Sequence, residues 1–269
     1  MLNSLTVRTA DRKTSFRESV CRVSSQDLNL PPLFTGMGFA PDANLPGEAL
    51  YRATRRRMDP GTVCYSQRPD QLDAIIMLAP ETELSHAIQV IYPLMLAAND
   101  ALGATLPPGV AVHMAWPDRL FVNGALAGGL ALFTQHEDLS TVPDWMLARI
   151  SIDIMGNPKN PFPGEALDRT SLYEEGAGEA SAPALLESFC RYFLNWLDRW
   201  QRDGLTSIKE LWLERAAGRD KAVSFPNDGT LIRGLVTDLT NTGDLIITRD
   251  GKPQTLMLSG LLAGPSWEL

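Results

Sequence analysis

The chain has 269 residues, which is enough for one large domain and one small domain. Its hydrophobic content of 44% and charged content of 21% are ordinary for a globular protein. No window approaches 18 uninterrupted apolar residues, so no membrane-spanning helix is expected, and a net charge of -8 argues against nucleic acids or anionic membranes as partners. The three cysteines are far apart, which indicates neither a disulfide framework nor a zinc knuckle and favours a reducing cytoplasm.

Residues 1–29 carry basic side chains among many Ser and Thr residues, with little apolar periodicity. We interpret them as a flexible N-terminal extension, because a secretory signal would need an apolar central region. A transit-like peptide and an over-extended gene start are the alternatives. The folded domain is expected to begin at about residue 30.

The first predicted elements are a helix and two strands. Pro46–Met58 is predicted to form the helix. Thr62–Ser66 has the β-branched and aromatic content of a strand, and Leu72–Ala79 is expected to be a largely buried strand.

A long helix and a third strand follow. Glu83–Leu102 has apolar residues at helical spacing, and Pro93 is expected to kink this helix. Gly109–Met114 is a predicted strand that leads into the turn Trp116-Pro117-Asp118.

A predicted hairpin begins with the short apolar strand Leu120–Val122. Asn123-Gly124 comes next and is a strong hairpin signal, because both central positions of a type I′ turn need φ > 0. The return strand begins with small residues that let another backbone or a flat ligand come close. We expect this hairpin at the centre of the sheet, with a ligand-facing or carrier-facing cleft beside it. The candidate ligand-binding residues are Trp116, Pro117, Asp118, Asn123, Gly124, Ala127, Gly128 and Gly129.

The middle of the chain returns to a strand and then to helices. Trp145–Ile154 alternates like a half-buried strand, and Asn157–Ala166 is a Pro-rich loop. Ala184–Asp203 has one broad apolar face and is the clearest helix of the chain, and Ser207–Ala217 is a final helix.

Beyond about Phe225 the pattern becomes strand-like. Thr230–Thr237, Asp244–Thr248 and Gln254–Leu262 are predicted strands joined by tight turns. A β module of ~35–40 residues is too small to be very stable alone, so it is expected to pack on the main domain.

The stretch Ala115–Leu132 resembles the signature of biotin protein ligases, which reads roughly K-W-P-N-D-L, then a turn, then K-L-A-G-I-L. The matching residues are Trp116, Pro117, Leu120, Leu126, Ala127, Gly128 and Leu130. Ala115 stands in the place of the family's ligand-contacting lysine, and Asp118-Arg119 replaces Asn-Asp. The resemblance implies an α+β fold with a mixed, mainly antiparallel sheet flanked by helices. It implies a ligase-like catalytic domain over residues 30–222 and a small SH3-like β domain over residues 225–269.

The resemblance covers most of the chain from about Pro46 and is closest to a divergent bacterial subgroup of the biotin/lipoate ligase superfamily. Ser151–Asn157 is similar to the family's G-I-G-I-N-V-N strand, and Thr170-Ser171-Leu172 is similar to its A-T-S-L segment. The family's G-R-G-R-R-G-R loop is missing. Ser66–Leu72 closes that gap directly and keeps only Arg68.

The resemblance implies that ATP and a carboxylic acid, biotin or lipoate, form an acyl-adenylate. A lysine of an acyl carrier domain protein then attacks the acyl carbon. Neither step needs an enzyme nucleophile, but both need cationic or N–H groups that stabilise phosphoryl and carbonyl oxygens. Because the lysine and the arginine loop are both replaced, we expect substitute cations. Arg119, close to Ala115, and Arg68, in the shortened turn, are the catalytic candidates, and Arg55–Arg57 supplies further cations.

Asp118 has two interpretations. It helps to hold the Mg²⁺ that accompanies ATP, since Mg²⁺ prefers carboxylate oxygens, or it caps the turn. No resident metal site is predicted, because His86, His113 and His136 are dispersed without a zinc-binding motif.

Three functional hypotheses follow. The first is an ATP-dependent ligase or acyltransferase of the biotin/lipoate class with a remodelled site. The second is a non-catalytic protein that binds an acyl carrier domain or a small carboxylic acid, and the third is a transferase between carriers that needs no ATP. Sequence-specific DNA binding is not expected, because about 29 unpatterned residues precede the domain and the net charge is negative.

Overall fold

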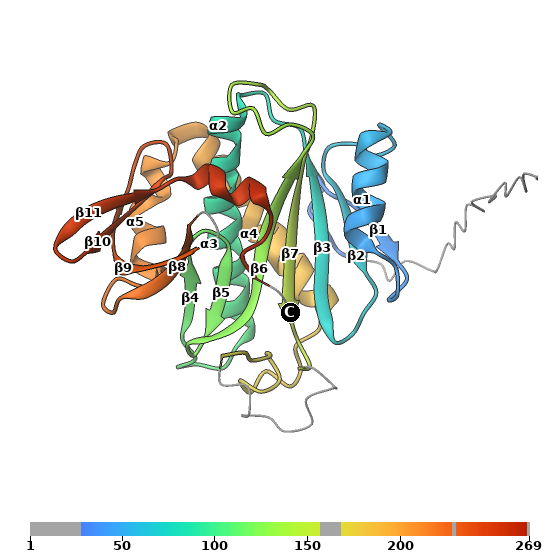
Figure 1. The fold of residues 1–269 in the computed structure, drawn as a ribbon. Helices are drawn as coiled ribbons and strands as arrows, with labels where there is room; N and C mark the ends of the chain where they lie inside the picture. Colours follow the sequence, from blue (N-terminus) through green and yellow to red (C-terminus); the bar gives the residue numbers. More distant parts are fainter. Residues whose placement is uncertain (1–27, 157–167, 228–229, 268–269) are drawn as a thin grey trace, which may run out of the picture.

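The structure is a computed structural model that describes residues 28–156, 168–227 and 230–267. The predicted N-terminal extension lies almost entirely outside these residues, and the Pro-rich loop 157–166 lies outside them. A seven-stranded sheet has the strand order β1-β2-β3-β7-β6-β5-β4 (Figure 1). Its strands are β1 (Thr35–Phe39), β2 (Thr62–Ser66), β3 (Gln71–Leu78), β4 (Val112–Ala115), β5 (Arg119–Val122), β6 (Ala125–Thr134) and β7 (Met146–Asp153).

The sheet is mixed and mainly antiparallel, as predicted. β1 and β2 run parallel, and the other neighbouring strands pair antiparallel. The helices that surround it are α1 (Leu45–Thr54), α2 (Leu84–Ala87), the 3-10 helix η1 (Ile88–Val90), α3 (Ile91–Thr105), α4 (Ala182–Asp203) and α5 (Thr206–Arg215).

Helices α3 and α4 pack on each other and cover one face of the sheet (Figure 1). Helix α4 begins where the Ser181 hydroxyl accepts a hydrogen bond from the backbone of Ala184 and where Pro183 fits the first turn, and it ends at Gly204. Helix α1 packs on the opposite side of β2 and β3, against a second apolar cluster that includes Cys64 and Ile75.

Strand alternation gives the sheet two chemically different faces. On the face covered by α3 and α4, the paired positions Leu72, Ile152 and Gly128 form one row. The adjacent row lies on the opposite face and consists of Asp73, Ser151, Gly129, Arg119 and Ala115. We call this second side of β3, β7, β6, β5 and β4 the polar face.

A second, four-stranded antiparallel sheet with the order β11-β10-β9-β8 forms the predicted C-terminal β module. Its strands are β8 (Val223–Asn227), β9 (Thr230–Leu239), β10 (Leu245–Arg249) and β11 (Lys252–Leu256). Phe225, Val236 and Leu245 belong to the same hydrophobic cluster as α3 and α4, so the module packs on the main domain. The 3-10 helix η2 (Leu258–Ala263) then crosses in front of the main sheet (Figure 1).

Several expectations need correction. The hairpin β5–β6 is not at the centre of the sheet; β7 is, and β5 lies beside the edge strand β4. Strands β1 and β8 were not predicted, and the predicted strand Gln254–Leu262 ends at Leu256, after which the chain turns into η2. The long helix is interrupted at Ile88–Val90, because Pro93 has no N–H to donate to the carbonyl of Gln89.

The segment Leu84–Thr105 is long and apolar enough to cross a membrane by length and composition alone. Its most apolar window has a mean hydropathy of 1.2, and 83% of that window is buried inside the fold. This segment is therefore the core of the domain, where Ile91, Met95 and Leu102 are fully buried.

Candidate active site

The Trp116-Pro117-Asp118 turn joins β4 to β5 and is buried. Trp116 belongs to the main hydrophobic cluster, so its ring faces the core. The Asp118 carboxylate accepts hydrogen bonds from the backbone N–H of Ser266 at 2.7 Å and from the Ser266 hydroxyl. The backbone carbonyl of Asp118 accepts a bond from the N–H of Leu130 at 2.7 Å. Asp118 thus ties the turn to β6 and to a segment near the end of the chain, and both of its carboxylate oxygens are engaged there.

Burial raises the pKa of Asp118 to about 6, although the bonds from Ser266 and the charge of Arg119 lower it. An ionised carboxylate is costly away from water, and burial therefore favours the protonated form. In this arrangement the Asp118 carboxylate binds Ser266 rather than its own turn, and both of its oxygens take part in that contact.

The hairpin turn has the backbone that the sequence predicts. Asn123 and Gly124 have φ values of 49° and 88°, as a type I′ turn requires. The Asn123 side chain accepts a bond from the N–H of Ala111 at 3.1 Å and donates one to Glu175 at 2.5 Å. Asn123 therefore fastens the hairpin to its neighbours, while Gly124 lines a cavity described below.

Ala127, Gly128 and Gly129 have different surroundings although they are consecutive. Ala127 is fully buried in the core. A Cβ on Gly128 would overlap the carbonyl oxygen of Ser151 and lie 2.9 Å from Cα of Ile152, so this glycine permits close approach of β7. A Cβ on Gly129 would instead overlap the indole of Trp267 on the polar face. The flat group beside Gly129 is a side chain of the protein itself.

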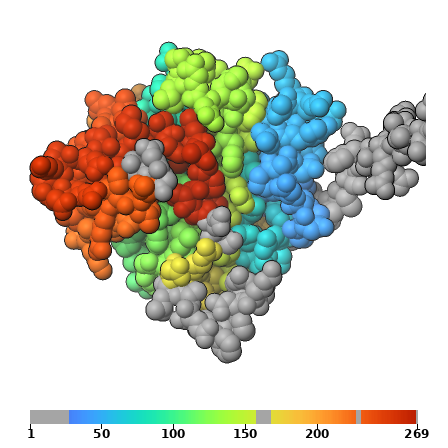
Figure 2. Space-filling view, viewed as in Figure 1, coloured from blue at the N-terminus to red at the C-terminus, as the bar shows by residue number. Residues whose placement is uncertain are grey.

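Trp267 lies on the polar face and is 6% exposed. Its indole N–H donates a hydrogen bond to the carbonyl of Leu130 at 2.7 Å, and the Arg149 guanidinium lies 5.6 Å from its ring centroid. The C-terminal residues, in red, lie against the green strands in the middle of this face (Figure 2). Sequence reasoning missed this contact, and an isolated Trp after the last strand was the one available signal.

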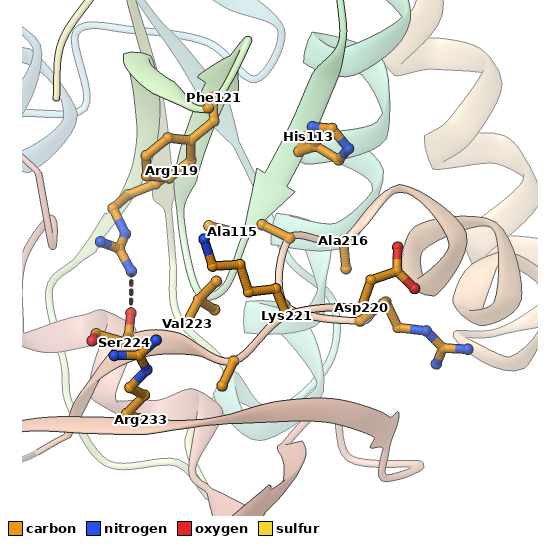
Figure 3. A pocket seen from close by; sticks show the side chains of 15 residues that line it. His113, Ala115, Arg119, Phe121, Ala216, Asp220, Lys221, Val223, Ser224 and Arg233 are labelled. Carbon is orange, nitrogen blue, oxygen red and sulfur yellow. Dashed lines mark hydrogen bonds between the residues drawn. The ribbon is translucent and has the colours of Figure 1, made fainter. Parts of the chain in front are cut away.

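A cavity of about 620 Å³ lies between β4 and β5, the chain that follows α5, and the C-terminal sheet. Its basic side chains are Arg219 and the three that Figure 3 labels, Arg119, Lys221 and Arg233. His113, Ala115 and Asp220 also line it. We call it the basic pocket. Because basic groups outnumber the Asp220 carboxylate, its wall favours an anionic ligand.

Arg119 is the part of the basic pocket that sequence reasoning selected. It pairs with Ala115 across β4 and β5, so its side chain starts beside the position of the family's lysine. One of its terminal nitrogens donates to the carbonyl of Ser224 at 3.1 Å, and its guanidinium lies 5.7 Å from the Phe121 ring centroid. Its Nε is buried without a hydrogen-bond partner among the described residues. Burial lowers the pKa of Arg119, and the charge of Asp118 partly offsets this.

Arg68 lies elsewhere. It forms a paired hydrogen bond with Asp70, at 3.1 Å from Nε and 2.6 Å from a terminal nitrogen. This bond raises the pKa of Arg68 and lowers that of Asp70. Arg68 lines a separate cavity of about 440 Å³ beside the start of α4. The structure therefore does not bring Arg68 and Arg119 into one site.

The run Arg55–Arg57 lies at the end of α1, also away from the basic pocket. Arg55 and Arg57 stack over Tyr51, and Arg56 forms an exposed ion pair with Asp144 at 3.4 Å.

The floor of the polar face carries charged residues that sequence reasoning missed. Arg149 and Asp73 form a paired salt bridge at 2.7 and 3.0 Å, with side chains 21% and 12% exposed. Burial raises the pKa of Asp153, on the same strand as Arg149, to about 6. The signal was present: each is a charged residue within a largely apolar strand.

A bound metal ion and a cysteine nucleophile both find little support in the described part of the chain. No group of three or more His, Cys, Asp or Glu side chains there is placed to hold a metal ion. Cys64 and Cys190 are free and buried, and burial raises the pKa of each thiol to about 12. Neither thiol is a reactive nucleophile at neutral pH.

The fold is an α+β domain with a small C-terminal β module, and a basic pocket lies next to the Trp-Pro turn. Together these features place the protein in the class of ligase-like proteins. The model of the biotin/lipoate A/B protein ligase family matches residues 30–214, and the chain belongs to this family.

Three relatives show how far the likeness extends. The biotin--[acetyl-CoA-carboxylase] ligase of Paracoccus denitrificans is 23% identical over 174 residues, which are 64% of this chain and 71% of the relative. The crystal structure of a biotin protein ligase-like protein of unknown function from a Silicibacter species is 31% identical, with a TM-score of 0.76 over 87% of this chain and 99% of that one. The biotin protein ligase of Aquifex aeolicus, at 18% identity, has a TM-score of 0.65 over 83% of this chain and 96% of its own and shares the fold.

Proposed function

We propose that this protein attaches or transfers a biotinyl- or lipoyl-type acyl group to a lysine of an acyl carrier domain, using a remodelled site on the polar face. The carrying observation is Arg119. It pairs directly with Ala115 and lines a pocket with Arg219, Lys221 and Arg233. These cations supply positive charge where the resemblance expects the ligand-contacting lysine.

The chemistry needs such charge twice. In the first step a carboxylate oxygen of the acid attacks the α-phosphorus of ATP, and pyrophosphate leaves. In the second step the carrier lysine attacks the acyl carbon, the C–O bond to AMP breaks, and the lysine loses a proton. Both steps place negative charge on phosphoryl and carbonyl oxygens, which fixed cations in a partly buried pocket stabilise.

Arg119 and Lys221 of the basic pocket are positioned in different ways. Arg119 is partly buried and fixed by the carbonyl of Ser224. Lys221 is exposed and extends towards the side of the pocket that Ala115 forms (Figure 3). We assign Arg119 to the acyl and α-phosphoryl oxygens and the exposed Lys221 to the leaving pyrophosphate, since an ammonium on a long, flexible side chain can follow a departing group.

The substrates proposed are ATP and a small carboxylic acid. The biotin protein ligase of Aquifex aeolicus has been solved in complex with biotin and ATP, and it shares this fold. Because the described residues contain no metal cluster, Mg²⁺ enters this proposal only as the ion that accompanies ATP. We propose the cytoplasm, where carrier domains and ATP meet, as the location, and we propose no nucleic-acid partner.

Pyrophosphate release from ATP tests the proposal, measured with biotin and with lipoate, together with mass spectrometry of carrier domains incubated in the same mixtures. Arg119→Ala should reduce adenylate formation by on the order of 100-fold, the usual loss when one stabilising donor is removed. Arg119→Lys should restore part of it, because the charge returns.

The matched control is Arg56→Ala, an exposed arginine in the turn after α1 and outside the pocket. It should leave adenylate formation unchanged. Wild-type protein that releases no pyrophosphate and modifies no carrier with either acid contradicts the proposal. Carrier modification without ATP would instead identify the transferase.

A further inference from the structure

The segment 264–267 follows η2 and lies across the polar face. Trp267 covers Gly129, which has no side chain in the way, and Gly129 pairs with Arg119 of the basic pocket. On the other side of Trp267 lies Arg149 with its partner Asp73. The indole therefore occupies the surface between the basic pocket and the charged floor of the sheet.

This position is where the proposed reaction needs its acid. An acid whose carboxylate lies at Arg119 directs its acyl chain either out of the basic pocket or along the row of paired residues towards Gly129 and Ser151. Along that row, Gly129 offers no side chain to obstruct it. A flat or chain-like acyl group fits there only if the indole of Trp267 is elsewhere.

Several directional contacts help to hold the segment. The indole N–H bonds to the Leu130 carbonyl at 2.7 Å, Arg149 lies 5.6 Å from the ring centroid, and Ser266 donates to the Asp118 carboxylate. An acid that carries an N–H donor, such as the ureido ring of biotin, can compete for the same carbonyl, and a negatively charged or polarisable group can compete for the guanidinium. The segment is thus held by groups that are also suitable for binding a ligand.

We propose that segment 264–267 is an intramolecular gate, in which Trp267 occupies the acyl-binding surface and must leave before an acid binds there. The inference rests on the proposed function for the nature of the acid. In the closed state the segment competes with the acid, so the apparent dissociation constant is the intrinsic one divided by the fraction of open molecules.

Calorimetric titration of biotin and of lipoate into the protein without ATP measures this competition. Trp267→Ala removes the competing ring, and we expect it to bind one of these acids about 10- to 100-fold more tightly than the wild type. Trp267→Phe keeps a flat ring but loses the N–H bond to Leu130, and it should bind with intermediate affinity. The matched control is Met257→Ala, an exposed side chain before η2, which should leave the affinity unchanged.

Hydrogen exchange in the wild-type protein needs no variant and reports on the gate directly. Saturating acid should speed the exchange of the Ser266 amide, because the bond from the Ser266 N–H to Asp118 opens. Faster exchange supports the gate, and unchanged or slower exchange in acid-saturated protein contradicts it.

The outcomes for the gate and for the proposed function are separable. Tighter acid binding by Trp267→Ala, without pyrophosphate release by any variant, supports the gate and contradicts the ligase. Pyrophosphate release together with equal or weaker binding by a folded Trp267→Ala protein supports the ligase and overturns the gate. Absence of binding of either acid to both proteins also overturns the gate.

Discussion

The two faces of the seven-stranded sheet use the same strands but are filled in different ways. On one face, α3 and α4 pack apolar side chains against residues such as Ile150 and Ile152. On the polar face, the Arg149–Asp73 pair and the indole of Trp267 lie where apolar packing would otherwise be. The face covered by α3 and α4 is sealed by apolar packing. On the opposite side, α1 packs on the apolar cluster around Cys64 and Ile75, and beside Gly129 the polar face is covered by Trp267, which directional contacts help to hold.

The two faces also differ in how far apart in the sequence their contacting residues lie. Contacts on the face covered by α3 and α4 follow from alternation within each strand, from the amphipathic helix α4 and from the mostly buried helix α3. The bond from Trp267 to Leu130 joins residues 137 positions apart, and the bond from Ser266 to Asp118 joins residues 148 positions apart. The polar face is thus completed by the last described part of the chain, which follows the strands of both sheets in the sequence.

Replacing each of the two adjacent glycines by alanine should give the largest contrast between the faces. Gly128→Ala forces a methyl group against the backbone of β7, which cannot move without breaking the sheet. We expect a loss of about 3 kcal/mol in the free energy of unfolding, at the upper end for overpacking. Gly129→Ala meets only the indole of Trp267, which can move away, and should lose about 1 kcal/mol. Urea unfolding of both variants measures the difference.

Equal losses for the two glycines would contradict the comparison, because they would mean that Trp267 is held as firmly as a strand backbone. The double variant with Trp267→Ala is the control. Removing the indole should relieve most of the loss caused by Gly129→Ala and none of the loss caused by Gly128→Ala, since the two sites couple only through that ring.

Much of the fold follows from local sequence. The Asn123-Gly124 turn, the amphipathic helix α4 and the strand β7 are encoded by positive-φ residues, helical spacing and strict alternation, each within about 20 residues. Strand β1 was missed because Thr35–Phe39 has two glycines in five residues and is ordered by parallel pairing with β2. No local pattern contains that partner.

The site is less predictable for the same reason. The place of Arg119 beside Ala115 follows from a short turn, so sequence proximity was a sound guide. Arg219, Lys221 and Arg233 reach the same pocket from distant segments, and nothing in their own neighbourhoods indicates it. Trp267 is the least predictable residue of the site. Its partner Leu130 belongs to the distant hairpin, and the residues next to Trp267 in the sequence form no strand.

The pH dependence of the free energy of unfolding tests how firmly the polar face is closed, because the titratable Asp118 joins the Trp-Pro turn to segment 264–267. Burial raises the pKa of Asp118 to about 6, so its contribution to stability is complete below about pH 4 and is lost as the pH rises through 6. The Asp118→Asn variant does not titrate there. The difference in unfolding free energy between wild type and variant should change by roughly 2 kcal/mol between pH 4 and pH 7.

Urea unfolding of both proteins at several pH values gives this difference. Asp153, whose pKa is also raised to about 6, is present in both proteins, so its contribution cancels. A difference that stays constant across this range would show that Asp118 is more solvated than the structure implies, and that the contact with Ser266 is open in solution.

The smallest effect is expected at Arg68, which lines the cavity beside α4 and not the basic pocket. Its guanidinium is already paired with Asp70, and their side chains are 41% and 32% exposed. An exposed pair of this kind contributes little, so Arg68→Ala should lower the free energy of unfolding by no more than about 0.5 kcal/mol. Because Arg68 and Arg119 line different cavities, pyrophosphate release should also stay within about 3-fold of wild type, against a loss on the order of 100-fold for Arg119→Ala. A comparable loss for both variants would mean that the substrate bridges both cavities beneath a displaced Trp267, and the basic pocket alone would then be too small a description of the site.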